Sequence, residues 1–312
     1  MKTRIFIGSS REGLNEAYYV KSKFQDAGFE VFVWNDDIFK ANKNTLETLL
    51  NAAGIFDFGI MIATKDDFTH SREQSFDTAR DNVLFEFGLF LGRLGDNRAF
   101  VLQEEGVKLP SDLLGITIPR FMKAKDYTYE IGFNRDIEDI INIIKEKLEL
   151  GELGLLPSTV LAIGYYENFV FPVCEALQKM QSIELNSKLY KDFKFNIVIP
   201  KDLDSNIRTR AAVYFKNMKM QEVKIDVFGR SFPLYLQMDE ESSINKAVLY
   251  DMPTTLGGID KAIELFMRKG HIGKTKQQDL LEERELRNFT CTLLNLIKQD
   301  AITRENVFII EE

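Results

Sequence analysis

The sequence predicts an α/β protein in two parts: a doubly wound parallel sheet over residues 1–150, followed by an α+β domain over residues 151–312. In the first part, short apolar runs alternate with amphipathic segments, which is the pattern of a parallel sheet covered by helices. In the second part, long helical segments frame a few strands and a hairpin. A chain of 312 residues is long enough for two cores, and Gly151–Gly154 is the expected boundary.

The elements of the first part follow in order from these patterns. The predicted strands are Arg4–Gly8, Glu30–Trp34, Phe58–Ala63, Ala99–Leu102 and Ile116–Pro119. The predicted helices are Glu16–Ala27, Thr45–Ala53, Arg80–Leu94 and Asn134–Leu148. Such a sheet binds ligands in the crevice off the carboxyl ends of its strands.

The helix over Arg80–Leu94 carries one carboxylate, Glu86, inside an otherwise apolar stretch. Apolar residues recur along one face and extend around its sides, so we expect the helix to be largely buried. They are Val83, Phe87, Phe90, Leu91 and Leu94 on the face, with Leu84, Phe85 and Leu89 at the sides. A buried carboxylate is costly unless it is paired or faces a polar cavity, so Glu86 is a candidate functional acid with a raised pKa. The alternative is a structural ion pair with Arg80 or Arg93.

Three loops should meet at the crevice. The turn Gly8–Arg11 offers a permissive glycine, two hydroxyls and a cation to phosphate oxygens, although such a turn is also common without a ligand. Trp34 can stack on a ligand or serve as a core aromatic. The polar segment Thr64–His70 is predicted to be a loop, and His70 an ordinary loop histidine.

Residues 3–122 resemble the TIR-like nucleotide-binding family of bacteria. The matching segments are Arg4–Arg11, Thr64–Asp67, Ala79–Gly88, Gly92–Gly95 and Leu109–Asp112. In catalytic TIR domains, the glutamate on the helix after the third strand is required to cleave the nicotinamide N-glycosidic bond of NAD, and Glu86 matches it. The resemblance implies a flavodoxin-like sheet, with NAD⁺ as substrate and no cofactor or metal. The implied substrate contacts are Gly8, Ser9, Ser10, Arg11, Trp34, Asp66 and Arg80.

A single carboxylate suits this chemistry. Nicotinamide in NAD⁺ is a cationic group that leaves as a neutral molecule, so the general acid of an ordinary glycosidase is unnecessary. One carboxylate can hold the ribose hydroxyls and stabilise an oxocarbenium-like transition state by its charge.

The second part has a different pattern of elements. The predicted elements are an aromatic-rich helix over Leu161–Pro172, a strand over Phe195–Pro200, a hairpin over Val223–Met238 with Arg230 at its tip, a strand and loop over Ala247–Leu256, and a helix over Gln277–Lys298. The charged stretch Gln277–Arg287 is expected to be solvated or to face a dimer partner.

This order of elements resembles the cyclic-dinucleotide-binding domain of STING over residues 153–300. The resemblance rests on Gly164–Tyr166 with Phe169, on Ile199–Pro200 before Asp202, on the Arg230 hairpin and on Asp251–Thr254. Bacterial STING proteins occur as fusions to a TIR domain. A two-fold cyclic ligand is well matched by a symmetric homodimer.

The STING resemblance gives five residues a role in ligand binding. Tyr165 and Phe169, four residues apart on a helix, can stack on a base. Asp251, assisted by Thr254, can accept the N1–H and amine of guanine, and Arg230 can close over a phosphate or over guanine O6 and N7. The alternatives are core aromatics, a turn residue at Asp251 and a solvated Arg230.

Composition limits the classes of partner and the cellular location that we expect for this chain. A net charge of −8 argues against a nucleic-acid polymer. The two cysteines, Cys174 and Cys291, have no motif spacing and indicate a reducing compartment. Because no apolar run approaches about 20 residues and no signal peptide is evident, we expect a cytoplasmic protein without a membrane anchor.

Together these features predict an NAD⁺ hydrolase that is activated by a cyclic dinucleotide and serves antiphage defence. Cyclic di-GMP is the expected ligand, with cyclic GMP-AMP second, and the homodimer is expected to assemble into a higher oligomer or filament. Two alternatives stay open: a non-catalytic binding scaffold, and a nucleosidase that acts on another N-glycoside. Whether the product is linear or cyclic ADP-ribose is also open.

Overall fold

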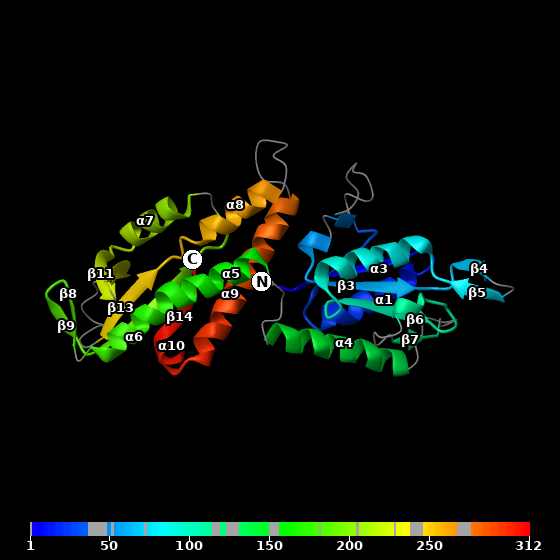
Figure 1. Cartoon of the computed structure of the whole chain (residues 1–312), viewed down its shortest axis with the longest axis horizontal. Coiled ribbons are helices and arrows are strands. Elements are labelled where there is room, and N and C mark those ends of the chain that lie inside the picture. Colours follow the sequence, from blue (N-terminus) through cyan, green and yellow to red (C-terminus); the bar gives the residue numbers. More distant parts are fainter. Residues whose placement is uncertain are drawn as a thin grey trace. The chain divides into compact units, whose positions relative to one another are not determined.

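The protein is described by a computed structural model that covers residues 2–36, 49–50, 53–71, 74–113, 119–122, 131–149, 156–180, 182–203, 206–227, 229–237, 246–266 and 276–312. The chain forms two compact units, Met1–Glu152 and Leu153–Glu312 (Figure 1). The boundary predicted at Gly151–Gly154 lies outside the described residues, so it stays a prediction.

The first unit is built on a parallel sheet in the order β2-β1-β3-β6-β7. Its strands are β1 (Arg4–Ser9), β2 (Glu30–Val33), β3 (Phe58–Ala63), β6 (Ala99–Glu104) and β7 (Arg120–Phe121). Its helices are α1 (Leu14–Asp26), α3 (Asp81–Leu94), a short 3₁₀ turn (Ser111–Leu113) and α4 (Ile131–Glu149). Successive strands are added on one side of β1 up to β2 and then on its other side from β3 onward. This strand order is that of a flavodoxin-like doubly wound sheet, as predicted.

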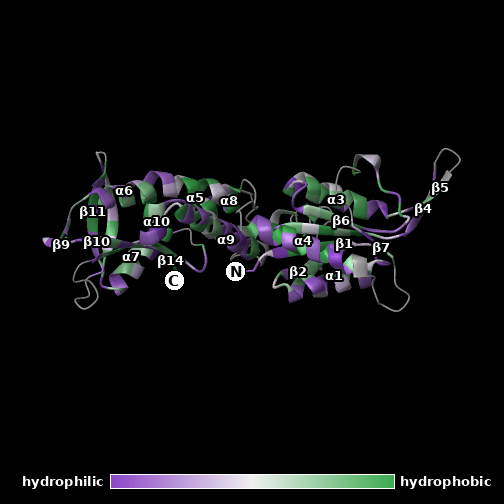
Figure 2. Cartoon of the chain, turned by 90° about the horizontal axis from the view of Figure 1, so that it is seen from below, coloured by the Kyte–Doolittle hydropathy of each residue, from purple (hydrophilic) through white to green (hydrophobic). Residues whose placement is uncertain are grey.

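Helices cover both faces of this sheet (Figure 2). On one face α3 packs through Phe90, whose ring stacks on Phe6 of β1 at 4.8 Å. On the other face α1 and α4 lie together, with the Tyr19 and Phe133 rings 6.2 Å apart. The three central strands are therefore buried on both sides, as expected for a parallel sheet.

Two predictions for the first unit are wrong. Within the segment Thr64–His70, only Thr64–Asp66 is a loop, because β4 (Asp67–Ser71) and β5 (Gln74–Thr78) form an antiparallel hairpin. The helix α3 is amphipathic and not largely buried: Val83 and Phe87 are buried, but Phe85 is 56% exposed. Leu84, Leu89 and Leu91 are only partly buried.

Two further predicted elements fall largely on residues that the structure leaves undescribed. They are the helix over Thr45–Ala53 and the strand over Ile116–Pro119. The described strand nearest to the second, β7, begins at Arg120.

The second unit is built on a mixed sheet in the order β11-β12-β13-β10-β14. Its strands are β10 (Asp192–Ile199), β11 (Gln221–Val227), β12 (Arg230–Leu236), β13 (Lys246–Asp251) and β14 (Val307–Glu311), and β8 (Ile183–Leu185) pairs separately with β9 (Lys188–Tyr190). Its helices are α5 (Pro157–Tyr165), a π-helical turn (Tyr166–Val170), α6 (Phe171–Lys179), α7 (Ile207–Asn217), α8 (Leu256–Phe266), α9 (Lys276–Gln299) and α10 (Ala301–Asn306).

The helix predicted over Leu161–Pro172 is one continuous helical stretch interrupted by the π turn. Pro172 lacks the N–H that would donate to the carbonyl of Asn168 in a regular α-helix, and the π turn lies directly before it. Such turns are often found at functional sites. This one contains Phe169.

Half of the charged stretch Gln277–Arg287 is not solvated as expected, while the alternative that this stretch faces a dimer partner stays a prediction. Glu282, Arg284, Glu285 and Arg287 are each at most 8% exposed. Glu285 Oε2 accepts the Ser158 N–H at 3.2 Å, in the first turn of α5, where the unpaired N–H groups of a helix favour a carboxylate. The charged part of α9 is therefore packed against α5.

Candidate active site and ligand-binding residues

The carboxylate of Glu86 lies against the end of β1. A Cβ atom at Gly8 would stand 3.0 Å from Glu86 Oε2 and only 2.3 Å from Met61 Sδ. Any larger residue at this position of the strand would have to displace the buried side chain of Met61. Because β1 ends one residue later, Glu86 reaches the edge of the sheet where ligands bind in folds of this class.

Glu86 is unpaired among the described residues. Its Oε2 atom is buried and has no hydrogen-bond partner, and burial raises the pKa of Glu86 to about 7. The described residues include no ion pair of Glu86 with Arg80 or Arg93. Arg80 Nη1 instead lies 3.4 Å from Glu12 Oε2. A carboxylate with this pKa is half ionised near neutral pH, and it can take part in chemistry that needs its charge.

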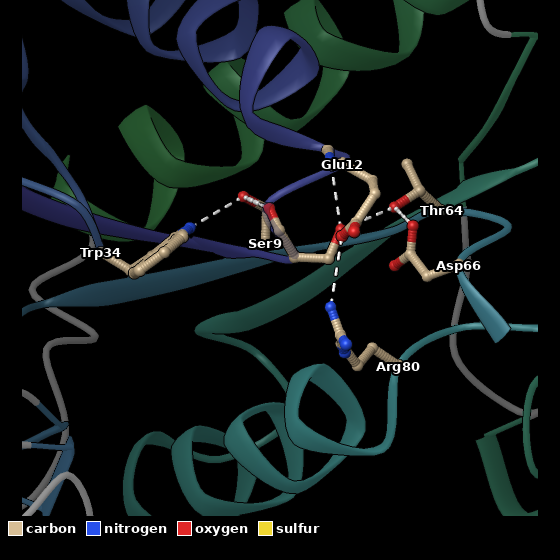
Figure 3. Close-up of polar contacts among 8 residues, drawn as sticks. Ser9, Glu12, Trp34, Thr64, Asp66 and Arg80 are labelled. Carbon is tan, nitrogen blue, oxygen red and sulfur yellow. Dashed lines mark hydrogen bonds and ion pairs between the residues drawn. The ribbon is translucent and has the colours of Figure 1, made fainter.

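A chain of hydrogen bonds joins the three predicted loops (Figure 3). Trp34 Nε1 donates to Ser9 Oγ at 3.0 Å. Ser10 Oγ lies 3.1 Å from Thr64 Oγ1, which donates to Asp66 Oδ1 at 2.8 Å. The side chains of Ser9, Ser10, Trp34 and Asp66 are thus brought together, as the sequence predicts for the carboxyl ends of neighbouring strands.

The two cations of the site differ in their surroundings. Arg80 directly precedes α3 and points toward Glu12 in Figure 3. Arg11 is exposed and makes no ion pair with a described residue. Since Ser9 and Ser10 use their hydroxyls inside the loop, Arg11 is the group of this turn best able to meet an anionic ligand. Asp66 Oδ2 is buried and also lacks a hydrogen-bond partner.

Sequence reasoning missed two residues of this arrangement. Thr64 holds Ser10 and Asp66 together, and its position directly after a buried strand was the available signal. Glu12 pairs with Arg80 across a separation of 68 residues, and no sequence pattern indicates that contact.

In the second unit, Tyr165 and Asp251 are joined directly. The Tyr165 hydroxyl donates to Asp251 Oδ2 at 2.6 Å, and Tyr165 is only 6% exposed. Burial raises the pKa of Asp251 to about 6, although the Tyr165 hydroxyl and the Met252 N–H favour the charged carboxylate. Tyr165 is therefore part of the core in this chain, and its role in base stacking stays a prediction.

Phe169 lies in an aromatic cluster on the same face of the sheet. Its ring centroid is 5.3 Å from that of Tyr165, 5.5 Å from Phe232 of β12 and 5.9 Å from Phe195 of β10. Phe169 is only partly buried, so part of its ring surface is accessible.

Strand register puts Arg230 at the same end of the sheet as Asp251. Tyr235 pairs with Tyr250 in the antiparallel ladder, so the start of β12 runs beyond the end of β13. Alternation along the strands directs Arg230, Phe232 and Asp251 to one face. Arg230 is exposed and lies about 13 Å along β12 from the position opposite Asp251, at roughly 3.3 Å per residue. It therefore lies beyond the end of β13.

The loop after β13 completes this region. Thr254 is exposed. Its neighbour Thr255, which sequence reasoning did not select, has a buried hydroxyl without a hydrogen-bond partner. Among the described residues, none of the helices combines the length and apolar character that crossing a membrane requires.

Comparisons with known proteins match each unit separately. Residues 4–123 match the model of the CAP12/Pycsar effector protein TIR domain, and residues 157–294 match the prokaryotic STING domain. A CD-NTase-associated protein 12 of Flavobacterium daejeonense is 58% identical over 312 residues, covering all of both chains. The Pycsar effector protein BcPycTIR of Burkholderia cepacia is 42% identical over 130 residues, which are 41% of this chain and 43% of that protein. A solved bacterial STING in complex with c-di-GMP is 60% identical, with a TM-score of 0.47, and covers 51% of this chain and 97% of its own.

Proposed function

Because the chain belongs to the CD-NTase-associated protein 12 family, with a TIR domain followed by a STING domain, we propose that it is an NAD⁺ hydrolase activated by a cyclic dinucleotide. The observation that carries the catalytic part is the buried, unpartnered carboxylate of Glu86 at the end of β1. The proposed reaction releases nicotinamide and ADP-ribose.

The charge of Glu86 is what the reaction uses. As the bond from nicotinamide to C1 of the ribose breaks, positive charge moves from the pyridinium ring to the ribose. A fixed carboxylate that is poorly solvated stabilises that charge more than water does. Nicotinamide leaves as a neutral base, so no proton donor is required, and water then adds at C1 to give ADP-ribose. This accounts for a site with one unpaired acid.

The remaining contacts of the proposed NAD⁺ site come from the loops around Glu86. Arg11 is available to the pyrophosphate, and the backbone of Gly8 allows a close approach. Trp34 and Asp66 are held in place by their bonds to Ser9 and Thr64. Arg80 contributes a second positive charge at the start of α3.

The proposed ligand of the STING unit is cyclic di-GMP, with cyclic GMP-AMP second. Asp251 is a hydrogen-bond acceptor at the mouth of the aromatic cluster, and guanine offers a matching pair of donors, N1–H and the exocyclic amine. Adenine presents an acceptor at N1 and would leave the carboxylate poorly paired. Tyr165, Phe169, Arg230 and Thr254 are the other proposed contacts.

We propose a homodimer that joins through α5. Val160 and Ile163 of this helix are 59% and 41% exposed. Apolar side chains grouped on an outer helix face are typical of an interface. Ligand binding would then favour a larger assembly, a higher oligomer or filament, in which TIR domains meet. This requires that the ligand bind the assembled state more tightly than the free dimer.

The proposed role is antiphage defence by exhaustion of cellular NAD⁺. It places the protein in the cytoplasm, and the absence of a disulfide at Cys174 and Cys291 among the described residues suits a reducing compartment.

The catalytic assignment is tested by Glu86→Gln. This change keeps the shape of the side chain and removes its charge, so nicotinamide release in the presence of cyclic di-GMP should fall by about 100-fold or more. Asp81→Asn, which removes an exposed carboxylate from the same helix, is the matched control and should keep full activity. A folded Glu86→Gln protein that releases nicotinamide at the parent rate would exclude the assignment. If the parent cleaves a different N-glycoside and leaves NAD⁺ intact, the protein is another nucleosidase.

The base preference is tested by Asp251→Asn. The parent should bind cyclic di-GMP more tightly than cyclic di-AMP by about 5- to 150-fold, the effect of leaving one buried acceptor unpaired. The Asn variant can keep its bond to Tyr165 but should lose most of the preference. Asp226→Asn on the exposed side of β11 is the control. Calorimetry that finds an unchanged preference in Asp251→Asn would contradict the proposed base contact.

A further inference from the structure

The hairpin of β4 and β5 connects the two halves of the proposed NAD⁺ site. It begins directly after Asp66 and ends at Thr78, two residues before Arg80. It extends past the carboxyl ends of the parallel strands, in the same direction as β3 points (Figures 1 and 2). The hairpin therefore projects from the edge of the sheet at which Glu86 and the Ser9 loop lie.

One face of this hairpin is anchored to the body of the unit. Lys108 Nζ lies 3.5 Å from the centroid of the Phe76 ring, and Lys108 N donates to Asp77 O at 2.8 Å. Thr69 and Thr78 lie on that same face, with their hydroxyls 3.0 Å apart. A two-stranded hairpin is barely stable alone in water, and these contacts hold it in a fixed position.

The opposite face presents an aromatic ring to solvent. Phe68 is 61% exposed, and His70 packs against it edge to face with the centroids 5.1 Å apart. His70 Nδ1 lies 2.7 Å from Ser75 Oγ, which fixes the imidazole ring. We call this surface, made by Phe68, His70, Ser75 and the exposed Asp77 opposite Phe68, the Phe68 face.

The Phe68 face begins next to the site along the chain. Asp66 lies directly before β4, and its N–H donates to Thr64 O at 3.0 Å and to Thr78 O at 3.3 Å, outside the regular ladder in which Asp67 pairs with Thr78. Side chains alternate along β4, so Phe68 and His70 share one side of the hairpin. Asp66 is bonded through Thr64 to the Ser10 loop. Phe68 lies about 7 Å and His70 about 13 Å beyond Asp66 along the strand, at roughly 3.3 Å per residue.

We propose that the Phe68 face is a stacking platform for the adenine base of the dinucleotide whose nicotinamide ribose lies at Glu86. This rests on the proposed function. The two nucleosides of NAD⁺ are joined by a pyrophosphate, so a dinucleotide bound at Glu86 and Arg11 must place its adenine beyond that loop. A fixed, exposed aromatic ring binds the face of a base by stacking.

The test is Phe68→Ala, measured by steady-state cleavage of NAD⁺ and by inhibition with adenosine monophosphate, which carries the adenine without nicotinamide. KM for NAD⁺ and the inhibition constant of adenosine monophosphate should both rise by about 5- to 150-fold, the effect of one base stack. The turnover number should stay within about twofold, because Glu86 is untouched. Phe68→Trp keeps a ring and should keep both constants. Tyr18→Ala, which removes an exposed aromatic residue from α1, is the control.

An unchanged KM for NAD⁺ in Phe68→Ala would overturn the proposal. If ligand-dependent assembly is lost in light scattering while KM is unchanged, the Phe68 face is a protein contact and the proposal is overturned in favour of a second copy. If the parent does not cleave NAD⁺ at all, the proposed function fails. The platform is then judged by calorimetry with adenosine monophosphate: weaker binding to Phe68→Ala supports it, and equal binding overturns it.

Discussion

At the scale of single residues, Glu86 is in an environment that opposes its own ionisation. Its pKa of about 7 arises from burial, and no cation among the described residues offsets that cost. A protein selected only for stability would pair or replace such a group. A buried acid without a partner, held against the end of a strand of the sheet, is the pattern expected of a functional site.

The first prediction concerns the stability cost of Glu86. Its pKa is raised in the folded state from 4.5 to about 7, so the folded state binds the proton more tightly than the unfolded state. The resulting stability is fully present below pH 4.5 and is lost as the pH rises through 7. At pH 8 the free energy of unfolding of Glu86→Gln should therefore exceed that of the parent by about 1–3 kcal/mol, once solvent screening is allowed for. The variant should unfold at a higher denaturant concentration. At pH 5 most of this difference should be absent.

Trp34 makes this measurement specific. It is the single tryptophan of the chain and lies in the first unit, so its fluorescence reports the unfolding of that unit. The same stability difference between Glu86→Gln and parent at pH 5 and at pH 8 would contradict the raised pKa.

At the scale of elements, the main strands of both sheets could be predicted because each carries a short β-rich run. Figure 2 shows strands that are largely hydrophobic and a helix α4 whose colours alternate along its length. The hairpin of β4 and β5 could not be predicted in this way. Its side chains are mostly polar, and its stability comes from Lys108, 30 residues after Thr78 in sequence.

Tertiary contacts also explain the other elements that sequence reasoning missed. α7 is short and mostly polar outside, with Ala211 and Phe215 buried. Phe215 stacks on Tyr235 at 4.0 Å, a contact that pattern alone does not indicate. β14 becomes a strand because it pairs in parallel with β10, more than 100 residues earlier. The burial of Glu285 in α9 likewise depends on the N–H of Ser158.

The second prediction concerns how β14 is held. Arg210 of α7 donates from Nε to Glu312 Oε2 at 2.8 Å and from Nη1 to Asp202 Oδ1 at 2.7 Å. Its side chain is 21% exposed, so these charge-assisted bonds are partly shielded from solvent. Arg210→Met keeps the apolar stem and should destabilise the second unit by about 1–2 kcal/mol.

Amide hydrogen exchange checks this most directly. Protection at Val307–Glu311 should fall in Arg210→Met more than protection at β13. Arg208→Met, an exposed arginine on the same helix, is the control and should leave both unchanged. Equal protection of β14 in Arg210→Met and parent would show that the backbone pairing to β10 suffices.

At the scale of the whole molecule, the sequence locates the candidate sites better than it describes their use. Ser9, Ser10, Trp34 and Asp66 come together because strand ends in a parallel sheet converge, which a sequence pattern can predict, and Glu86 of α3 lies against Gly8 beside them. Tyr165 could not be assigned from sequence, because its bond to Asp251 spans 86 residues. The proposed coupling between the two units is a free-energy difference between assembly states. It cannot be predicted from a sequence pattern or from the structure of one chain.

Ligand gating can therefore be measured only on the assembled protein. If the ligand acts only by favouring an assembly in which TIR domains meet, activity should depend on protein concentration as well as on ligand. Arg230→Ala, which removes an exposed cation from the proposed ligand site, should lose activation more than dimerisation. Light scattering measures the dimer and the larger assembly in the same samples.

The most direct test is the rate of nicotinamide release from NAD⁺ by the full chain, with cyclic di-GMP, with cyclic GMP-AMP, with cyclic di-AMP and with no dinucleotide. We expect rapid release with cyclic di-GMP, less with cyclic GMP-AMP, little with cyclic di-AMP and almost none without ligand, and we expect Glu86→Gln to release nicotinamide about 100-fold or more slowly than the parent with cyclic di-GMP. Equally fast release with no dinucleotide present would contradict gating, and tight binding of cyclic di-GMP without any nicotinamide release would make the chain a binding scaffold.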